Sequence, residues 1–303
     1  MLQLQEAIKK IIERYIVNIV PFSDAVAASS TTIPILSSGR FKKCDQVVVY
    51  NQAVLDATGE GEIRTISCIP NRNTIELDIA LLDAYPAGTS FVQKLVGGSF
   101  VQGIYLGEPA KISHYPAITI NAIDKSNEWF TLSSTSETFQ IDITIFTEAA
   151  DYEASYRLMH IYAKQIETAL FRSLYPLVEP FDTATLAQAV SETDTFIQVT
   201  DAQDLVNHLT GFLFLESWNN LRSNRLKSIV GSGVFELAMP VGGVFEAGDT
   251  VIQPGRHFYN AFPRGIKFGT INQESTVFKA AVISYMAQEE VKRLVPFVDP
   301  LTF

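Results

Sequence analysis

The chain carries one sequence pattern twice, and this internal repeat limits the possible folds more than any other feature. Segments 74–93 and 234–253 align without a gap and share Glu, Leu, Ala, Gly and Gln at matching positions. Further matches lie upstream, where 47–50 falls opposite 211–214 and where Thr31, Ile33, Ile35 and Phe41 correspond to Thr195, Ile197, Val199 and Leu205. Such self-similarity is typical of a duplicated unit. We therefore predict two β modules related by internal duplication, at residues 28–98 and 188–256.

Both copies have the pattern of short strands. Apolar residues alternate with polar ones, and turn-forming residues separate the runs, as in Ser37-Ser38-Gly39 and in 231–233. An Ala-Gly pair precedes the last strand of each copy, at Gly88 and Gly248. Because glycine adopts a positive φ without the steric cost of a Cβ, we expect the same turn at both positions. Each module is predicted to be a small antiparallel barrel or sandwich.

The remaining segments, 1–27, 99–187 and 257–303, predict a frame into which the modules are inserted. Residues 115–120 and 139–146 alternate apolar and polar side chains, so we expect two strands that each bury one face. After the second module, Phe262-Pro263 and the strand-like run 277–285 follow in the same order and with the same character. The duplication is therefore extended, as a hypothesis, to the frame itself.

Two helices are expected in this frame. Residues 2–17 have apolar side chains at helical spacing and charged ones opposite them. A longer helix has an apolar stripe at Tyr152, Tyr156, Met159, Ala163, Ile166 and Leu170. Such a stripe is typical of a packing face, in the core or between subunits. The predicted fold class is α+β, with both helices packed on one sheet.

Composition limits the partners of the protein. The 303 residues include 33 acidic and 23 basic ones, a formal charge of −10 that opposes binding to nucleic-acid phosphate or to an anionic membrane. Cys44 and Cys68 are too few for a disulfide framework and indicate a chain made in a cytosol. The apolar N-terminal stretch is interrupted by Glu13 and Arg14, and no later run reaches membrane-spanning length. We expect neither secretion by this route nor insertion into a membrane.

Motifs that would carry chemistry are not recognisable. The four histidines are scattered without HExxH or paired cysteines, so no metal site is predicted. Gly97-Gly98 and Gly242-Gly243 belong to no phosphate-binding motif, and no cofactor is expected. Carboxylate pairs such as Glu289-Glu290 are interpreted as a solvated acidic surface. The sequence therefore predicts a protein that is not an enzyme and has no catalytic residues.

Three stretches of the frame carry a resemblance to a known family. They are Tyr115-Pro116-Ala117-Ile118-Thr119-Ile120, residues 139–145, and the helix opening Asp151-Tyr152-Glu153-Ala154-Ser155-Tyr156-Arg157. Together they resemble the tail-terminator family of long-tailed bacteriophages, in which an N-terminal helix, a similar strand, further strands and a long helix form the protomer. The similarity covers about half of the chain, and the β modules depart from the compact terminator pattern, so a neck adaptor or connector stays open as an alternative.

The resemblance implies a structural virion protein. It implies a ring, usually hexameric, that caps the tail tube and joins it to the head connector, with tube, sheath and connector proteins as partners. DNA would pass an acidic lumen without specific binding, and the chain would be made in the host cytoplasm and found in the virion neck or tail. The predicted subunit interface comprises Tyr115, Phe139, Ile141, Ile143, Ile145, Tyr152, Tyr156 and Met159.

A carbohydrate-binding or hydrolytic protein is the rival interpretation. Paired β modules can display a binding site on their loops. A deep pocket lined by Trp129, Trp218 and carboxylates would favour this rival, whereas a ring of subunits would favour the neck protein.

Overall fold

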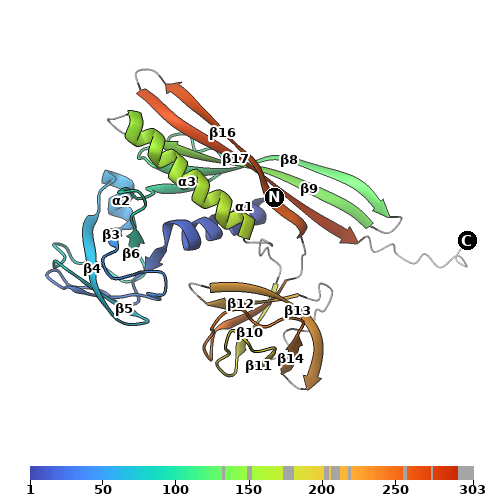
Figure 1. Ribbon diagram of the computed structural model, residues 1–303. Helices are drawn as coiled ribbons and strands as arrows, with labels where there is room; N and C mark the ends of the chain where they lie inside the picture. Colours follow the sequence, from blue (N-terminus) through green and yellow to red (C-terminus); the bar gives the residue numbers. More distant parts are fainter. Residues whose placement is uncertain are drawn as a thin grey trace, which may run out of the picture.

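The chain folds into three β-sheets and a small number of helices. The computed structural model describes residues 1–131, 134–148, 152–172, 181–200, 205, 212–217, 220–231, 233–254, 258–273 and 276–292. The described part is mostly β, which agrees with the predicted α+β class at that coarse level. Figure 1 shows the sheet of the frame at the top, the first module at the left and the second module below.

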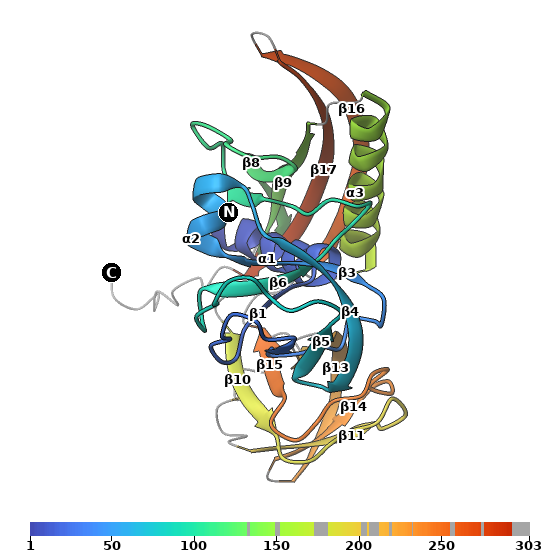
Figure 2. The same ribbon diagram turned by 90° about the vertical axis from the view of Figure 1, so that its left-hand side faces the viewer.

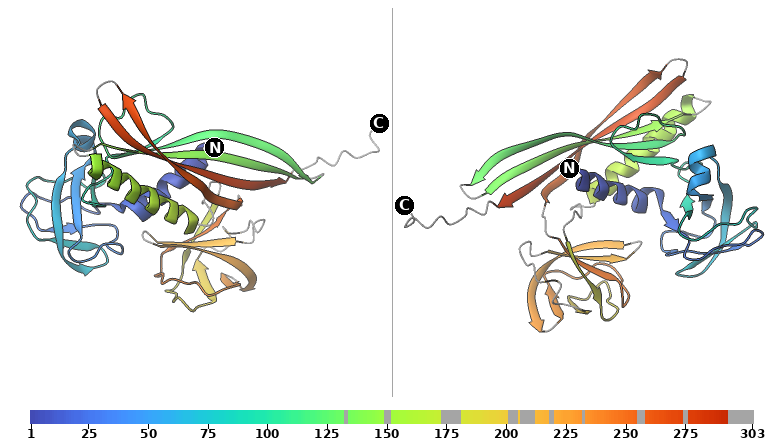
Figure 3. Two further views of the ribbon diagram at one scale, coloured as in Figure 1. Left: turned by 45° about the horizontal axis from the view of Figure 1, so that its top comes forward. Right: turned by 180° about the vertical axis from the view of Figure 1, so that it is seen from behind.

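The frame sheet has five strands in the order β16-β17-β9-β8-β7. Their bounds are β7 Gly103–Leu106, β8 Ala117–Thr131, β9 Ser134–Thr147, β16 Phe258–Gln273 and β17 Thr276–Lys292. β7 runs parallel to β8, and the other pairs are antiparallel. Because Lys279 pairs with Thr147 and Lys292 with Ser134, the β8–β9 and β16–β17 hairpins extend from opposite ends of the sheet (Figures 1 and 3).

Two helices cover one face of this sheet. They are α1, Leu2–Ile12, which continues as a π-helical turn over Glu13–Val17, and α3, Tyr152–Arg172. α3 runs alongside β17 (Figure 2). Ile141, Ile143 and Ile145 of β9 are fully buried, in one cluster with side chains of both helices. On the opposite face of the sheet, the Ser284 hydroxyl donates a hydrogen bond of 2.8 Å to Asp142 Oδ1. The prediction of one dry and one polar face is confirmed.

The first module is a six-stranded sheet in the order β1-β6-β3-β4-β5-β2. Its strands are β1 Ile19–Pro21, β2 Thr32–Pro34, β3 Gln46–Asn51, β4 Glu62–Asn71, β5 Thr74–Leu77 and β6 Ser90–Lys94. One short helix, α2 Gln52–Thr58, follows β3, and the Asn51 side chain caps it by accepting a hydrogen bond of 3.0 Å from the Ala53 N–H.

The second module is a closed barrel in the order β10-β11-β14-β13-β12-β15. Its strands are β10 Phe181–Leu186, β11 Phe196–Thr200, β12 Phe212–Ser217, β13 Asn220–Gly231, β14 Val234–Leu237 and β15 Thr250–Pro254. Strand for strand, this is the order of the first module. The isolated bridge between Val190 and Phe245 also matches the one between Val26 and Tyr85. The modules therefore share a topology, while their origin by duplication stays a prediction.

The gap-free alignment of the modules fails at the closing strand. Val92 and Val251 take the same core position in the two modules. The Phe22 N–H donates to the Ser90 carbonyl, and in the same way the Leu186 N–H donates to the Asp249 carbonyl. Ser90 is therefore equivalent to Asp249, which directly follows Gly248, so Thr89 is an extra residue of the first copy and the shared glutamines are not equivalent.

The third strands of the two modules, β3 and β12, also match differently from the sequence prediction. Val47 and Val49 occupy the core positions of Leu213 and Leu215, so residue 47 does not lie opposite Gly211. A register shift of an even number of residues keeps apolar side chains on the same face, so periodicity alone does not reveal it.

Both modules begin before the predicted boundaries of 28 and 188. β1 pairs with β6 and β10 with β15, as in Ile19 with Gln93 and Phe181 with Pro254. The first and last strands of each module are therefore neighbours, which lets a whole module be inserted between two frame elements. Each half of the chain contains a helix, a module and an antiparallel hairpin, in the predicted order. Independent folding of these units stays a prediction.

The shared Ala-Gly turn has the predicted backbone. Gly88 and Gly248 have φ values of 78° and 91°. A Cβ added at either would meet no atom within 4 Å, so backbone strain alone opposes a side chain there.

Gly248→Ala should therefore lower the free energy of unfolding by about 1 kcal/mol, measured by urea denaturation. Gly231→Ala is the matched control, since Gly231 lies in the same barrel, has the same open surroundings and lacks a positive φ. Equal midpoints for the two variants would contradict the assigned strain.

Candidate assembly surface

The eight residues predicted to form a subunit interface do not lie on one surface. Phe139, Ile141, Ile143, Ile145 and Met159 are at most 2% exposed and belong to the core of the frame. Tyr115, before β8, is half-buried. Only Tyr152 and Tyr156 are largely exposed, at 64% and 43%. The five core side chains pack inside the chain itself and present no surface to a neighbour, which corrects their assignment to the interface.

The apolar stripe predicted for α3 lies on two different faces of the helix in its first turns. The buried side of α3 consists of Ser155, Met159, Tyr162, Ala163, Ile166 and Leu170. Ser155, a polar residue, takes the first core position because its hydroxyl bonds the Thr147 side chain at 3.0 Å and the Thr147 carbonyl at 3.2 Å. Tyr152 and Tyr156 lie beside this stripe, so the apolar spacing in the sequence joined two different faces of the helix.

Tyr152, Tyr156, His160 and Phe268 form a continuous aromatic row on the outside of the frame. The two tyrosine rings stack with centroids 6.3 Å apart, and the His160 ring lies 4.3 Å from Tyr156. Phe268 of β16 stacks on His160 at 4.1 Å and is 46% exposed. The row connects α3 with the edge of the sheet.

Lys279 of β17 fixes one end of the aromatic row. Its ammonium lies 3.9 Å from the Tyr152 ring centroid and donates a hydrogen bond of 2.7 Å to Thr270 Oγ1. Neither His160 nor Phe268 was predicted to lie on this surface. His160 follows Tyr156 at the same four-residue step that separates the tyrosines, which was a usable signal, whereas Phe268 has no such signal.

β16 is an open edge of the frame sheet. It pairs with β17 and has no second neighbour among the described strands, so its outer N–H and C=O groups can accept another strand. Its residues 264, 265 and 267–270 are exposed. The strand contains Arg264 and Lys267 and no acidic residue, so this edge is basic.

At the opposite edge of the sheet, no described strand pairs with β8 beyond its short contact with β7. The four residues of β7, 103–106, pair with residues 117–120 of β8. The rest of β8 forms an exposed arm with β9. Asp124 and Glu128 are exposed on this arm, and Lys125 is paired with Glu137 at 2.8 Å. The arm is therefore acidic, in contrast to β16.

The described residues do not bring together the features expected of the rival hydrolytic protein. A cavity of about 640 Å³ beneath α3 has neither tryptophan nor carboxylate among its described lining residues. The Trp129 side chain and Trp218 lie outside what the structure describes. Within the described ranges, no three His, Cys, Asp or Glu side chains gather as a metal site would require. None of the described helices is both long and apolar enough to cross a lipid bilayer.

The solved structures that are similar to this chain include two phage proteins. The first is the tailspike protein gp49 of Pseudomonas phage LKA1, with 26% identity, a TM-score of 0.23, and coverage of 29% of this chain and 16% of that one. The second is the phage phi92 endosialidase, with 12% identity, a TM-score of 0.21, and coverage of 87% and 35%. At these TM-scores, neither likeness establishes a shared fold. No protein-family model and no curated protein matches the chain.

These findings bear on the predictions only coarsely. Both similar structures are phage proteins, in line with a phage structural protein, and neither is named as a tail terminator. The prediction that the protein is not an enzyme is contradicted, because one of the two is named an endosialidase. That prediction is not retained.

Proposed function

We propose that this chain is a structural virion protein of a tailed phage that assembles into a closed ring, caps the tail tube and joins it to the head connector. Its partners would be further copies of itself, tube and sheath proteins and the connector, in the neck or tail of the particle. We propose six subunits, the usual number in the family that the sequence resembles. A neck adaptor on the head side is the second candidate.

One observation supports ring assembly above the others: among the described strands, the frame sheet has two open edges of opposite charge. The basic edge is β16, with Arg264 and Lys267, and the acidic edge is the distal part of β8, with Asp124 and Glu128. When β16 of one copy pairs with β8 of the next, the sheet continues from subunit to subunit. Such an interface is heterologous, and repeated rotation closes it into a ring.

The aromatic row strengthens this docking surface. It borders β16 and exposes three large rings beside the strand edge. Exposed aromatic side chains next to a free edge are typical of protein–protein contacts, because they bury much apolar area and lose little conformational entropy. A neighbouring subunit that added a strand to β16 would cover them.

Charge reversal tests the two edges. Arg264→Glu with Lys267→Glu should raise the apparent dissociation constant of the assembly about tenfold or more, and so should Asp124→Lys with Glu128→Lys, because like charges then face each other. Light scattering after size exclusion, with negative-stain electron microscopy, measures ring and subunit. The four substitutions in one chain should restore the ring.

A matched control carries Lys10→Glu and Lys43→Glu, an equal change in net charge at exposed positions away from both edges. It should assemble like the parent chain. Loss of rings in this control, or no rescue by the four substitutions, would refute pairing through these edges.

Phage assembly separates the two candidates. Particles made without the protein should give filled heads and tails that do not join, with abnormal tail length for a terminator and normal length for an adaptor. Joined, infectious particles in its absence would overturn both.

A further inference from the structure

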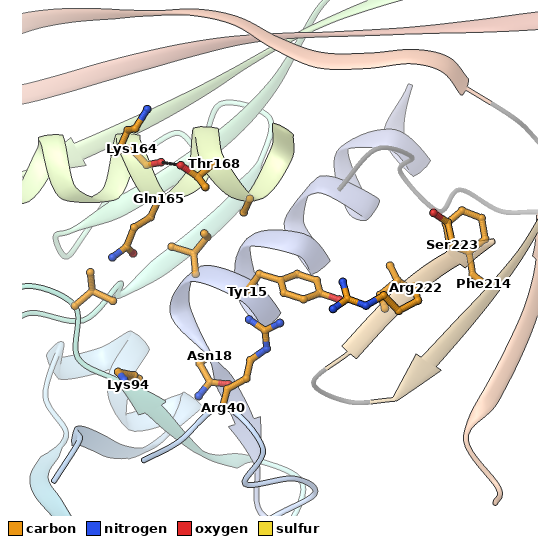
Figure 4. A pocket seen from close by; sticks show the side chains of 14 residues that line it. Tyr15, Asn18, Arg40, Lys94, Lys164, Gln165, Thr168, Phe214, Arg222 and Ser223 are labelled. Atoms are coloured by element: carbon orange, nitrogen blue, oxygen red, sulfur yellow. Dashed lines mark hydrogen bonds between the residues drawn. The ribbon is translucent and has the colours of Figure 1, made fainter. Parts of the chain in front are cut away.

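A cavity of about 640 Å³ lies where the frame, the first module and the barrel meet. Figure 4 shows Tyr15 and Asn18 reaching it from the π-helical turn, Arg40 from the first module, and Arg222 from the barrel, with α3 above. Its size is that of a site for a small organic molecule. It shares no residue with the two sheet edges or with the aromatic row.

The charge of this cavity is opposite to that of the chain. Arg40, Lys94, Lys164 and Arg222 line it, and the lining residues that the structure describes include no carboxylate, although the chain has a formal charge of −10. Lys94 is paired with Asp45 at 2.6 Å and Lys164 with Glu167 at 2.9 Å. These ion pairs reduce the positive charge that the two lysines offer to a ligand, and the two guanidinium groups remain charged at neutral pH.

Both guanidinium groups are held in place. Arg40 lies over the Tyr15 ring, with its central carbon 4.1 Å from the centroid. Arg222 donates a hydrogen bond of 3.0 Å from Nε to the Gly242 carbonyl. Burial lowers the pKa of Arg40; Tyr15 opposes this effect, and the neighbouring charge of Arg222 adds to it. Arginine stays protonated despite such shifts, so an anion between them is favoured.

Asn18 supplies an independent sign of a ligand. It is 6% exposed, ends the π-helical turn in a left-handed conformation with φ 50°, and lines the cavity. Its Nδ2 is buried and has no hydrogen-bond partner among the described residues. A buried donor without an acceptor is costly, and a bound oxygen atom would satisfy it.

We infer that this cavity binds the phosphate group of a small molecule. Arginine pairs bind phosphate oxygens in a bidentate manner, and the Asn18 amide and the Tyr15 hydroxyl add neutral donors. A phosphate also matches several cations better than a single carboxylate does, since it carries nearly two negative charges at neutral pH. Ile16, Val96 and Phe214 provide apolar wall for the remainder of a phosphate ester.

Binding would hold the three parts of the molecule together. Donors come from the frame, the first module and the barrel at once, beside the ion pair between Arg14 and Glu216 that already joins frame to barrel. A ligand that binds only this arrangement stabilises it by mass action.

Calorimetric titration of the full chain tests the inference, with inorganic phosphate and a nucleoside monophosphate as separate probes at constant ionic strength. Saturable binding of either is expected, and the comparison shows whether free phosphate or a phosphate ester is the better ligand. Arg222→Gln and Arg40→Gln should each weaken binding about tenfold or more. Arg225→Gln, an exposed arginine on the same strand that does not line the cavity, should leave it unchanged.

Thermal unfolding gives a second measurement. Phosphate should raise the melting temperature of the parent chain and of Arg225→Gln, and should raise it less for Arg222→Gln. The inference is overturned if sodium chloride of equal ionic strength has the same effect, if all three arginine variants respond alike, or if only duplex DNA binds.

Discussion

Replacing Met159 by aspartate should destabilise the chain by about 4 kcal/mol or more, because the new carboxylate would be buried without a partner. Met159 is 0% exposed and lies in the frame core between α3 and the isoleucines of β9. Urea unfolding followed by circular dichroism measures the loss. Met159→Leu conserves volume and should cost less than about 1.5 kcal/mol.

Tyr156→Asp separates folding from assembly in the same helix. Tyr156 is 43% exposed, so its aspartate variant should remain folded and lose only subunit contacts. A folded, cooperative Met159→Asp chain, or an unfolded Tyr156→Asp chain, would show that the two faces of α3 are wrongly assigned.

Glu62→Ala should cost about 3 kcal/mol, the second largest effect expected. The Glu62 carboxylate accepts hydrogen bonds from the Leu82 N–H at 2.8 Å, the Asp83 N–H at 2.9 Å and the Tyr85 hydroxyl at 2.9 Å, and it is paired with Arg64. Its side chain is only 10% exposed. Removing it takes one shared acceptor from all three donors and leaves Arg64 without this ion pair, and Glu62→Gln should lie between parent and alanine variant.

This contribution should depend on pH in one direction. Burial alone would raise the pKa of Glu62, but the two backbone N–H groups, the Tyr85 hydroxyl and Arg64 lower it below 4.5 overall. A lowered folded-state pKa means that the stabilisation is present above pH 4.5 and is lost as the pH falls through the folded value. The difference in unfolding free energy between parent and Glu62→Ala should therefore shrink below pH 4.5. A constant difference down to pH 3 would contradict this role.

Period-two patterns and glycines were the most informative parts of the sequence. Ile141, Ile143 and Ile145 alternate with polar residues, and they face the core as expected. Gly88 and Gly248 have the positive φ that their place before the last strand required. In both cases the cause is local, since side chains alternate along a strand and only glycine enters that turn without strain.

Features that depend on distant pairing could not be predicted. β1 and β10 are recognisable as module strands only through their partners β6 and β15, which lie far along the chain. The same holds for the aromatic row, where Phe268 joins a helix more than 100 residues earlier, and for the cavity shared by Tyr15, Arg40 and Arg222. Sequence spacing carries no signal for such encounters, because tertiary packing alone decides them.

The pairing of β9 with β17 sets an order for folding during synthesis. The ribosome makes residues 134–147 long before residues 276–292, so the inner edge of β9 must wait while the whole barrel is translated. Since the first and last barrel strands are neighbours, a barrel that folds first brings α3 and β16 together and reduces the entropy lost when the frame closes. A nascent chain stalled before β17 would expose the unpaired β9, and such intermediates are the ones that need a chaperone to avoid aggregation.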